Sequence, residues 1–294
     1  MMNVFTGLKF FLGLTPPGRR VNVFPDDVFL VSYPKCGNTW LRFLIANLIY
    51  PEKNPDLTNI SNLLPDIEGG RKRDIEHMQR PRILKSHQYF DHRYPKLIYL
   101  VRDPRDVALA EHHFDIKRRL IPENLPVERF VARFVSGQLN HPNGTWGEHV
   151  ASWLSTRRDD PQFLLLTYEA IQVQPMVELA RIASFLGIAA DNERLAFAVK
   201  QSAAERVREL EKKQGLVFGS TRETRQDMPY IRSGKSGGWK TALPQACVTE
   251  IESAWGGLMK EIGYELTVPA LANLPQKKRL PATVWEGSWT DVGG

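Results

Sequence analysis

Continuous apolar runs alternate along the chain with segments in which apolar residues recur every three or four positions. Residues 27–33, "DVFLVSY", form one such run, which is typical of a strand buried on both faces of a parallel sheet. In residues 39–50 the apolar positions follow helical spacing, and Pro51 ends the pattern. Residues 27–50 are therefore predicted to form a buried strand that turns directly into a helix.

The same alternation continues to residue 265. Strands are predicted over 81–87, 96–103 and 162–169. Helices are predicted over 104–114, 126–139, 145–158, 174–187, 191–200, 201–213 and 244–265. Residues 51–80 are predicted to form loops and short helices, and the Gly-, Ser- and Arg-rich segment 215–240 a functional loop. The pattern indicates a single α/β domain with a mainly parallel sheet flanked by helices.

Composition narrows the class of protein without choosing a function. The 294 residues are 42% hydrophobic and 24% charged, which suits an ordered globular chain. A net charge of +6 favours anionic small molecules or nucleotides. Cys36 and Cys247 belong to no CxxC pair, so a zinc site or disulfide framework is not expected and a cytoplasmic setting fits. The apolar part of residues 1–20 is short and interrupted by Lys9, so we expect no signal peptide and no membrane insertion.

The turn after the first strand, "YPKCGNTW" (33–40), carries residue types that suit phosphate binding. The unpaired N–H groups and the dipole of a helix N-terminus favour an anion. Gly37 allows close approach of the backbone, Lys35 adds a positive charge, and Thr39 adds a hydroxyl. The nucleotide-binding pattern G-x-x-x-x-G-K-[ST] is absent, because the lysine precedes the glycine and Ser32 occupies the first glycine position. The sequence thus predicts a phosphate loop of another type.

Four segments together resemble the cytosolic-type sulfotransferases, which transfer a sulfuryl group from 3′-phosphoadenosine-5′-phosphosulfate (PAPS). "YPKCGNTW" is similar to the family's TYPKSGTTW signature, and "LKSH" (84–87) to its KTH stretch. "IYLVRDPRDVALAEHHF" (98–114) resembles YVARNxKDVxVSxxxF, and "RSGKSGGWK" (232–240) resembles RKGxxGDWK. "LTYE" (166–169) matches one further position, and the resemblance covers about residues 26 to 264.

The resemblance implies an organisation and a set of ligands. It implies a phosphate-loop nucleotide-binding architecture related to P-loop NTPases, with an N-terminal extension at 1–24, a sulfotransferase domain at 25–268 and a C-terminal tail at 269–294. PAPS is the implied co-substrate and PAP the product, with a small-molecule acceptor and no nucleic acid. No metal is expected, because Lys and Arg supply the positive charge that Mg²⁺ supplies in kinases. The dimer motif of relatives is absent from "KTALPQACVT" (240–249), which leaves monomer and dimer open.

Three residues are implied to carry the chemistry. His87 is the predicted general base, and Lys35 is predicted to stabilise the leaving phosphate. Lys85 lies two residues before His87 on an extended chain and would steady the sulfuryl oxygens. The alternative for His87 is a purely structural role, and the alternative for Lys85 is an exposed lysine at the end of a strand.

A larger set is implied to bind the nucleotide: Lys35, Cys36, Gly37, Asn38, Thr39, Trp40, Arg102, Tyr168, Ser202, Arg232, Ser233 and Gly234. Trp40 would stack on adenine; the alternative is that its ring only packs in the hydrophobic core. Arg102 would bind the 3′-phosphate; the alternative is that it forms an ion pair with Asp103 or Asp106. Ser202 would lie near adenine or simply cap a helix.

Departures from the family pattern keep other hypotheses open. Ala110 and Ser233 stand where the family has serine and lysine, which would weaken contacts to the 3′-phosphate. Cys36 at a helix N-terminus could be a nucleophile, although no His/Asp partner motif accompanies it. The rival functions are an ATP-dependent small-molecule kinase with an atypical phosphate loop and a binding protein that has lost turnover.

Overall fold

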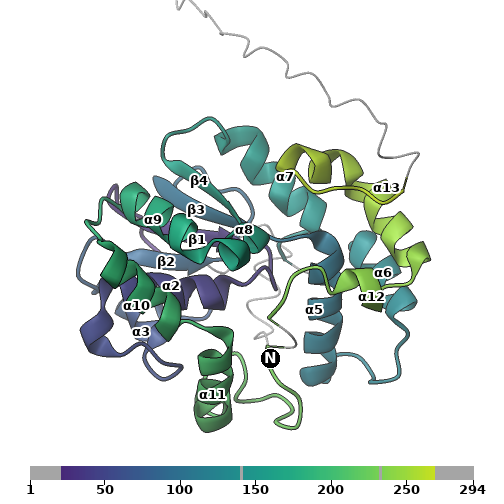
Figure 1. Cartoon of the computed structure of the whole chain (residues 1–294), viewed down its shortest axis with the longest axis horizontal. Coiled ribbons are helices and arrows are strands. Elements are labelled where there is room, and N and C mark those ends of the chain that lie inside the picture. Colours follow the sequence, from purple (N-terminus) through teal and green to yellow (C-terminus); the bar gives the residue numbers. More distant parts are fainter. Residues whose placement is uncertain (1–20, 140–141, 232–233, 269–294) are drawn as a thin grey trace, which may run out of the picture.

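A four-stranded parallel sheet forms the centre of the computed structural model, which describes residues 21–139, 142–231 and 234–268 (Figure 1). The strands are β1 (Val28–Ser32), β2 (Ile83–Ser86), β3 (Lys96–Val101) and β4 (Phe163–Thr167), in the spatial order β2-β1-β3-β4. All three neighbouring pairs are parallel, with Leu30 opposite Lys85 on one side and Ile98 on the other. The predicted parallel sheet and its four strands are confirmed.

Parallel pairing brings the carboxyl ends of all four strands to one edge of the sheet. The chain leaves this edge at Tyr33, His87, Arg102 and Tyr168, each within one residue of the end of its strand. Ligands of open α/β sheets bind outside the carboxyl ends of the strands. Residues far apart in the sequence are therefore gathered at one place in the fold.

The helices, in chain order, are α2 (Asn38–Ile49), the 3₁₀ turn η1 (Pro51–Lys53), α3 (Ile60–Leu63), α4 (Lys72–Glu76), α5 (Pro104–Lys117), α6 (Val127–Val135), α7 (Trp146–Arg157), α8 (Tyr168–Val173), α9 (Pro175–Leu186), α10 (Asn192–Gln201), α11 (Ala204–Gln214), α12 (Trp239–Ala242) and α13 (Gln245–Ile262). Alternate strand residues enter different cores, because side chains along a strand point to opposite faces. Phe29 and Tyr99 pack with α5, α6, α7 and α13, whereas Leu30 and Ile98 pack with α2, α9 and α10.

Helix ends follow the predicted signals. Asp103 caps α5 by accepting the Arg105 N–H at 2.9 Å, and Pro104 is the first helical residue. Gly187 ends α9 with φ of 72°. In the described part of the chain, no helix is both long and apolar enough to cross a bilayer.

Two short helices were missed in the sequence. The strand predicted over 162–169 ends at Thr167, because its hydroxyl accepts the Ala170 N–H at 3.1 Å and starts α8. Tyr168 is thus the first residue of a helix rather than part of a strand. The short helix α12 lies inside the segment that was predicted to be a loop. Neither helix is long enough to show an apolar period.

Candidate active site

A cavity of about 190 Å³ opens at the carboxyl edge of the sheet, and most of the predicted site residues line it. Those residues are Lys35, Gly37, Asn38, Thr39, Trp40, His87, Arg102, Tyr168 and Gly234. They come from the loop after β1, from the ends of β2, β3 and β4, and from the loop before α12. Cys36, Lys85 and Ser202 do not line the cavity. Arg232 and Ser233 lie outside the described residues.

The loop between β1 and α2 has the backbone geometry of an anion site. Gly37 adopts φ of 98° as the N-cap of α2, and no side chain caps the first turn. The first N–H groups of this helix are therefore available to an anion. A side chain at Gly37 would also collide with Tyr168, whose ring lies 2.6 Å from the position that a Cβ would occupy. This strand–loop–helix unit confirms the predicted phosphate-loop architecture.

Gly37→Ala is expected to destabilise the fold by more than Gly187→Ala. Gly187 has φ of 72° but open space around its Cβ position, so its substitution measures the backbone cost alone, about 1–2 kcal/mol. Gly37→Ala adds the collision with the Tyr168 ring. Urea unfolding of the two variants and the parent protein provides the comparison. Equal losses of stability would show that the loop moves freely away from Tyr168.

Lys35 presents a positive charge that is packed on aromatic faces. Its Nζ lies 3.6 Å from the centre of the Phe114 ring and 4.4 Å from that of Tyr230. Burial lowers the pKa of Lys35 below its usual value. Within the described ranges this ammonium group forms no ion pair with a carboxylate. An anionic ligand in the cavity would therefore supply its first opposite charge at contact distance.

The first turn of α2 adds polar groups and a ring to the cavity. The Thr39 hydroxyl lies 3.2 Å from the Tyr230 hydroxyl. Asn38 Nδ2 donates to the Ser32 hydroxyl at 3.1 Å, which fixes the start of the helix against β1. Trp40 is half-buried and packs edge-on against Tyr168, with ring centres 5.3 Å apart. Its exposed part remains available to a flat ligand, so Trp40 is not simply a core residue.

Arg102 joins the phosphate loop to the loop before α12. Its guanidinium group donates to the Lys35 carbonyl at 3.3 Å and to the Lys235 carbonyl at 3.1 Å, and lies 4.3 Å from the Tyr168 ring centre. The Tyr168 hydroxyl donates to the Gly234 carbonyl at 3.0 Å. These contacts hold the two loops together around the cavity.

The ion pair considered for Arg102 does not form in the structure. Asp103 instead pairs with Arg105 at 2.7 Å, and Asp106 accepts the N–H groups of Gly237 and Trp239. Arg102 Nε has no hydrogen-bond partner among the described residues. The guanidinium group therefore keeps donor capacity for a ligand.

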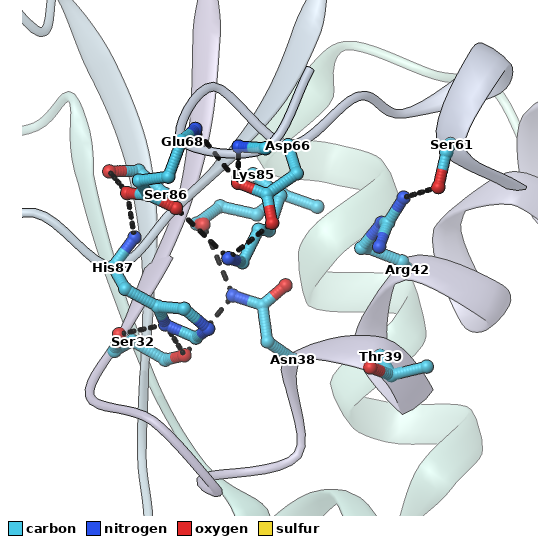
Figure 2. Close-up of polar contacts among 12 residues, drawn as sticks. Ser32, Asn38, Thr39, Arg42, Ser61, Asp66, Glu68, Lys85, Ser86 and His87 are labelled. Carbon is cyan, nitrogen blue, oxygen red and sulfur yellow. Dashed lines mark hydrogen bonds and ion pairs between the residues drawn. The ribbon is translucent and has the colours of Figure 1, made fainter. Parts of the chain in front are cut away.

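His87 is held in one tautomer by the backbone of β1 (Figure 2). Its Nδ1 lies 2.6 Å from the Ser32 carbonyl oxygen, which only accepts hydrogen bonds, so Nδ1 carries the proton. Nε2 then carries the lone pair. Burial lowers the pKa of His87 well below its usual value, and the nearby Lys85 charge adds to the effect. A neutral imidazole with its lone pair on Nε2 is the form that can accept a proton.

The structure places Lys85 in an environment that the sequence did not predict. Its Nζ donates to Asp66 Oδ2 at 2.8 Å and to Glu68 Oε2 at 3.0 Å, and only 9% of its side chain is exposed (Figure 2). Lys85 is therefore neither placed for the sulfuryl oxygens nor an exposed lysine. The loop that carries both carboxyl groups shows no periodic pattern, so sequence reasoning could not pair it with β2.

Cys36 and Ser202 are both buried. Cys36 is fully buried outside the cavity, and burial raises the pKa of its thiol, which excludes the nucleophile alternative. Ser202 ends α10 and is fully buried, with its hydroxyl donating to the Ala198 carbonyl at 2.8 Å and accepting from Asn47 at 3.1 Å. The helix-cap alternative for Ser202 is therefore correct.

Some residues of the site carry no recognisable sequence signal. Gln172 lines the cavity and binds the Gly234 carbonyl and the Ser236 N–H, but it lies on the unpredicted helix α8. The Ser32 carbonyl that orients His87 is a backbone group. Ala110 lines the cavity where a serine was expected from the resemblance. In the described ranges, no group of three or more His, Cys, Asp or Glu side chains could hold a metal ion.

Comparison with known proteins agrees with this geometry. The sulfotransferase domain family matches residues 25–263. Sulfotransferase 1B1 of Mus musculus is 29% identical over 247 residues, which cover 79% of this chain and 82% of that protein. Sulfotransferase 1E1 of Bos taurus is 29% identical over 254 residues, which cover 80% of this chain and 84% of that protein.

Solved structures share the fold. The structure of retinol dehydratase in complex with androsterone and inactive cofactor PAP superposes with a TM-score of 0.68 at 20% identity, covering 83% of this chain and 84% of that one. Mouse sulfotransferase SULT7A1 complexed with PAP gives a TM-score of 0.67 at 23% identity, covering 82% and 86%. With the family match spanning most of the chain, the protein belongs to the sulfotransferase domain family.

Proposed function

We propose that the protein transfers a sulfuryl group from PAPS to a hydroxyl or amine of a small-molecule acceptor. The observation that carries the proposal is the convergence of Lys35, Gly37 and His87 on one cavity at the edge of the sheet. A phosphate site, a positive charge and a neutral base are the groups that sulfuryl transfer requires. Family membership favours this reaction over the kinase alternative.

The phosphate loop and Arg102 would bind the nucleotide. The N-terminus of α2 would hold the 5′-phosphate, because its first N–H groups are uncapped. Lys35 would lie at the bridging oxygen between sulfur and phosphorus. Arg102 would bind the 3′-phosphate through its guanidinium donors, and Trp40 would stack on the adenine. PAPS supplies the activated sulfuryl group.

His87 would act on the acceptor, and Lys35 would act on the leaving phosphate. The acceptor oxygen forms a bond to sulfur as its proton moves to His87 Nε2. The bond between sulfur and the phosphate oxygen breaks, and its electron pair stays on the 5′-phosphate of PAP, next to the Lys35 ammonium. Atoms and charge balance without a further co-reactant.

Similar proteins and the limits of the family match support proposals for the acceptor, the cellular location and the domain limits. Related structures contain androsterone or retinol, which supports a small organic alcohol as the acceptor. A curated relative is Cytosolic sulfotransferase 12 of Arabidopsis thaliana, which supports the cytoplasm. We keep residues 25–268 as the sulfotransferase domain, with the extension 1–24 and the tail 269–294, near the limits of the family match.

Labelled PAPS with a panel of phenols, aliphatic alcohols and amines tests the reaction directly. We expect transfer of label to at least one acceptor without added metal. PAP should also stabilise the protein against unfolding, by about 2.7 kcal/mol at 100 times its Kd. A protein that bound PAP but transferred no label would be the binding protein considered from the sequence. Mg²⁺-dependent ATP turnover with no response to PAPS would instead identify a kinase.

A further inference from the structure

Two carboxyl groups and one ammonium group lie together behind His87 (Figure 2). Asp66 and Glu68, here called the carboxyl pair, both accept hydrogen bonds from Lys85 Nζ, at 2.8 and 3.0 Å. The Glu68 N–H also donates to Asp66 Oδ1, at 2.9 Å. None of the three residues lines the cavity, so the proposed transfer does not yet use them.

The loop that bears the carboxyl pair is fixed to the strand that bears the base. The Lys85 N–H donates to the Pro65 carbonyl at 2.8 Å, and the Ile67 N–H donates to the Lys85 carbonyl at 3.0 Å. Asp66 thus forms a single parallel β-bridge with Lys85 of β2. Asp66 Oδ1 accepts the Glu68 N–H at 2.9 Å, which fixes the turn between the two carboxyl groups. The positions of both side chains are therefore set by the backbone.

Glu68 holds the end of β2 through one oxygen. Its Oε1 accepts the His87 N–H at 2.6 Å, the Ser86 hydroxyl at 3.2 Å and Gln88 Nε2 at 3.4 Å. These bonds fix the backbone on both sides of His87, while the Ser32 carbonyl fixes the ring. The direction in which Nε2 points therefore depends on both anchors.

The carboxyl pair also balances the charge of Lys85. Two ionised carboxylates would leave excess negative charge, whereas one shared proton makes the group neutral. Burial, opposed by Lys85 and reinforced by Asp66, raises the pKa of Glu68. Burial also acts to raise the pKa of Asp66, but Lys85 and the hydrogen bond from Glu68 outweigh it and lower that pKa. Of the two carboxyl groups, Glu68 therefore binds a proton more readily than Asp66.

The other titratable group that faces His87 comes from α7. His149 Nε2 lies 3.1 Å from the His87 carbonyl oxygen, and burial lowers the pKa of His149 to about 4. His149 is therefore uncharged near neutral pH. Lys35 lines the same cavity as His87. Lys85 is thus the cation whose charge must be balanced before His87 can become an imidazolium.

We propose that the carboxyl pair positions the general base: Glu68 anchors the backbone of His87, and Asp66 and Glu68 together neutralise Lys85, so that the ring can accept a proton. This inference rests on the proposed sulfuryl transfer. Asp66 and Glu68 touch neither substrate nor reacting atoms and act through His87. Lys85, predicted from the sequence to contact the sulfuryl group, becomes part of the same support.

Glu68→Ala and Glu68→Gln test the anchor. The alanine variant removes the acceptor of the His87 N–H, whereas the glutamine variant keeps an amide oxygen for it. We expect Glu68→Ala to lower kcat about 10²-fold with unchanged PAP affinity, because a small misplacement of a base is costly. Glu68→Gln should recover most of the loss. An undiminished kcat in Glu68→Ala, or equal losses in both variants with PAP binding intact, would overturn the anchor.

Histidine NMR titration tests the neutralising role without any sulfate transfer. Asp66→Asn and Glu68→Gln alone each leave one carboxylate beside Lys85, so the pKa of His87 should stay near that of the parent protein. The double variant should lower it by about one unit, a tenfold change in proton affinity. Glu178→Gln, in an ion pair with Arg181 on α9, is the matched control and should change nothing.

The two experiments separate the inference from the function on which it rests. An unchanged pKa of His87 in the double variant overturns the neutralising role, whatever the activity. If Glu68→Ala fails to bind PAP, Glu68→Gln and the titration decide instead. A parent protein that transfers no sulfate, but whose double variant shows the shift, would lose the proposed function while the coupling of the carboxyl pair to His87 stands.

Discussion

His87→Ala is expected to lower kcat for sulfate transfer by about 10²–10⁴-fold, the range that a positioned general base contributes. The physical reason is the fixed tautomer: the Ser32 carbonyl accepts a hydrogen bond from Nδ1–H, so only Nε2 can accept the proton of the acceptor. PAP affinity should remain close to that of the parent protein, because His87 binds no phosphate in this mechanism. Turnover with labelled PAPS and calorimetry with PAP provide the two measurements.

The control for this variant is His77→Ala. His77 is exposed at the end of α4 and lies outside the cavity, so its loss should leave kcat unchanged. Loss of PAP binding in His87→Ala would indicate that the ring supports the nucleotide site and would remove the base assignment. Equal activity of the two variants would have the same consequence.

The dependence of kcat/KM on pH in the parent protein also follows from the protonation of His87. Burial and Lys85 lower the pKa of His87 below 6.5, so the imidazole stays neutral to lower pH than an exposed histidine. The acid limb of kcat/KM should therefore lie below pH 6.5, since activity is lost only when His87 becomes protonated. An acid limb at or above 6.5 would contradict this environment.

Much of the fold and of the phosphate site could be predicted because their determinants are local. The apolar run before Tyr33, the glycine in the turn and the helical spacing after Thr39 define a strand–loop–helix unit within about twenty residues. Asp103 and Pro104 likewise define the start of α5 from adjacent positions. Local rules of this kind need no knowledge of which strands are neighbours.

The errors arose where the outcome depended on distant contacts. Lys85 was placed by its spacing from His87, but Asp66 and Glu68 reach it from a loop that pairs with β2 only in the folded chain. Ser202 matched a family position loosely, and its burial against Asn47 of α2 decides its role. Sequence spacing identifies which residues share a segment, whereas tertiary packing decides which polar groups remain free for a ligand.

Lys35→Met is expected to lower kcat by about 10²–10³-fold, comparable to the loss of a donor that stabilises charge only in the transition state. Charge builds up on the bridging oxygen as the bond to sulfur breaks, so kcat should fall more than PAPS affinity. Burial lowers the pKa of Lys35, so kcat/KM of the parent protein should fall with rising pH below the usual lysine value of 10.5, and Lys35→Met should lack this limb.

Lys96→Met is the matched control for the lysine variant. Its ammonium group also lies over an aromatic ring, 4.7 Å from the centre of Phe185, but at the opposite end of β3 from the cavity. Removing it deletes a comparable cation–π contact and should leave kcat unchanged. A Lys35→Met protein with normal kcat and a raised KM would show that Lys35 binds ground state and transition state equally. The leaving group would then require another source of positive charge, and Arg102 is a cation that lines the same cavity.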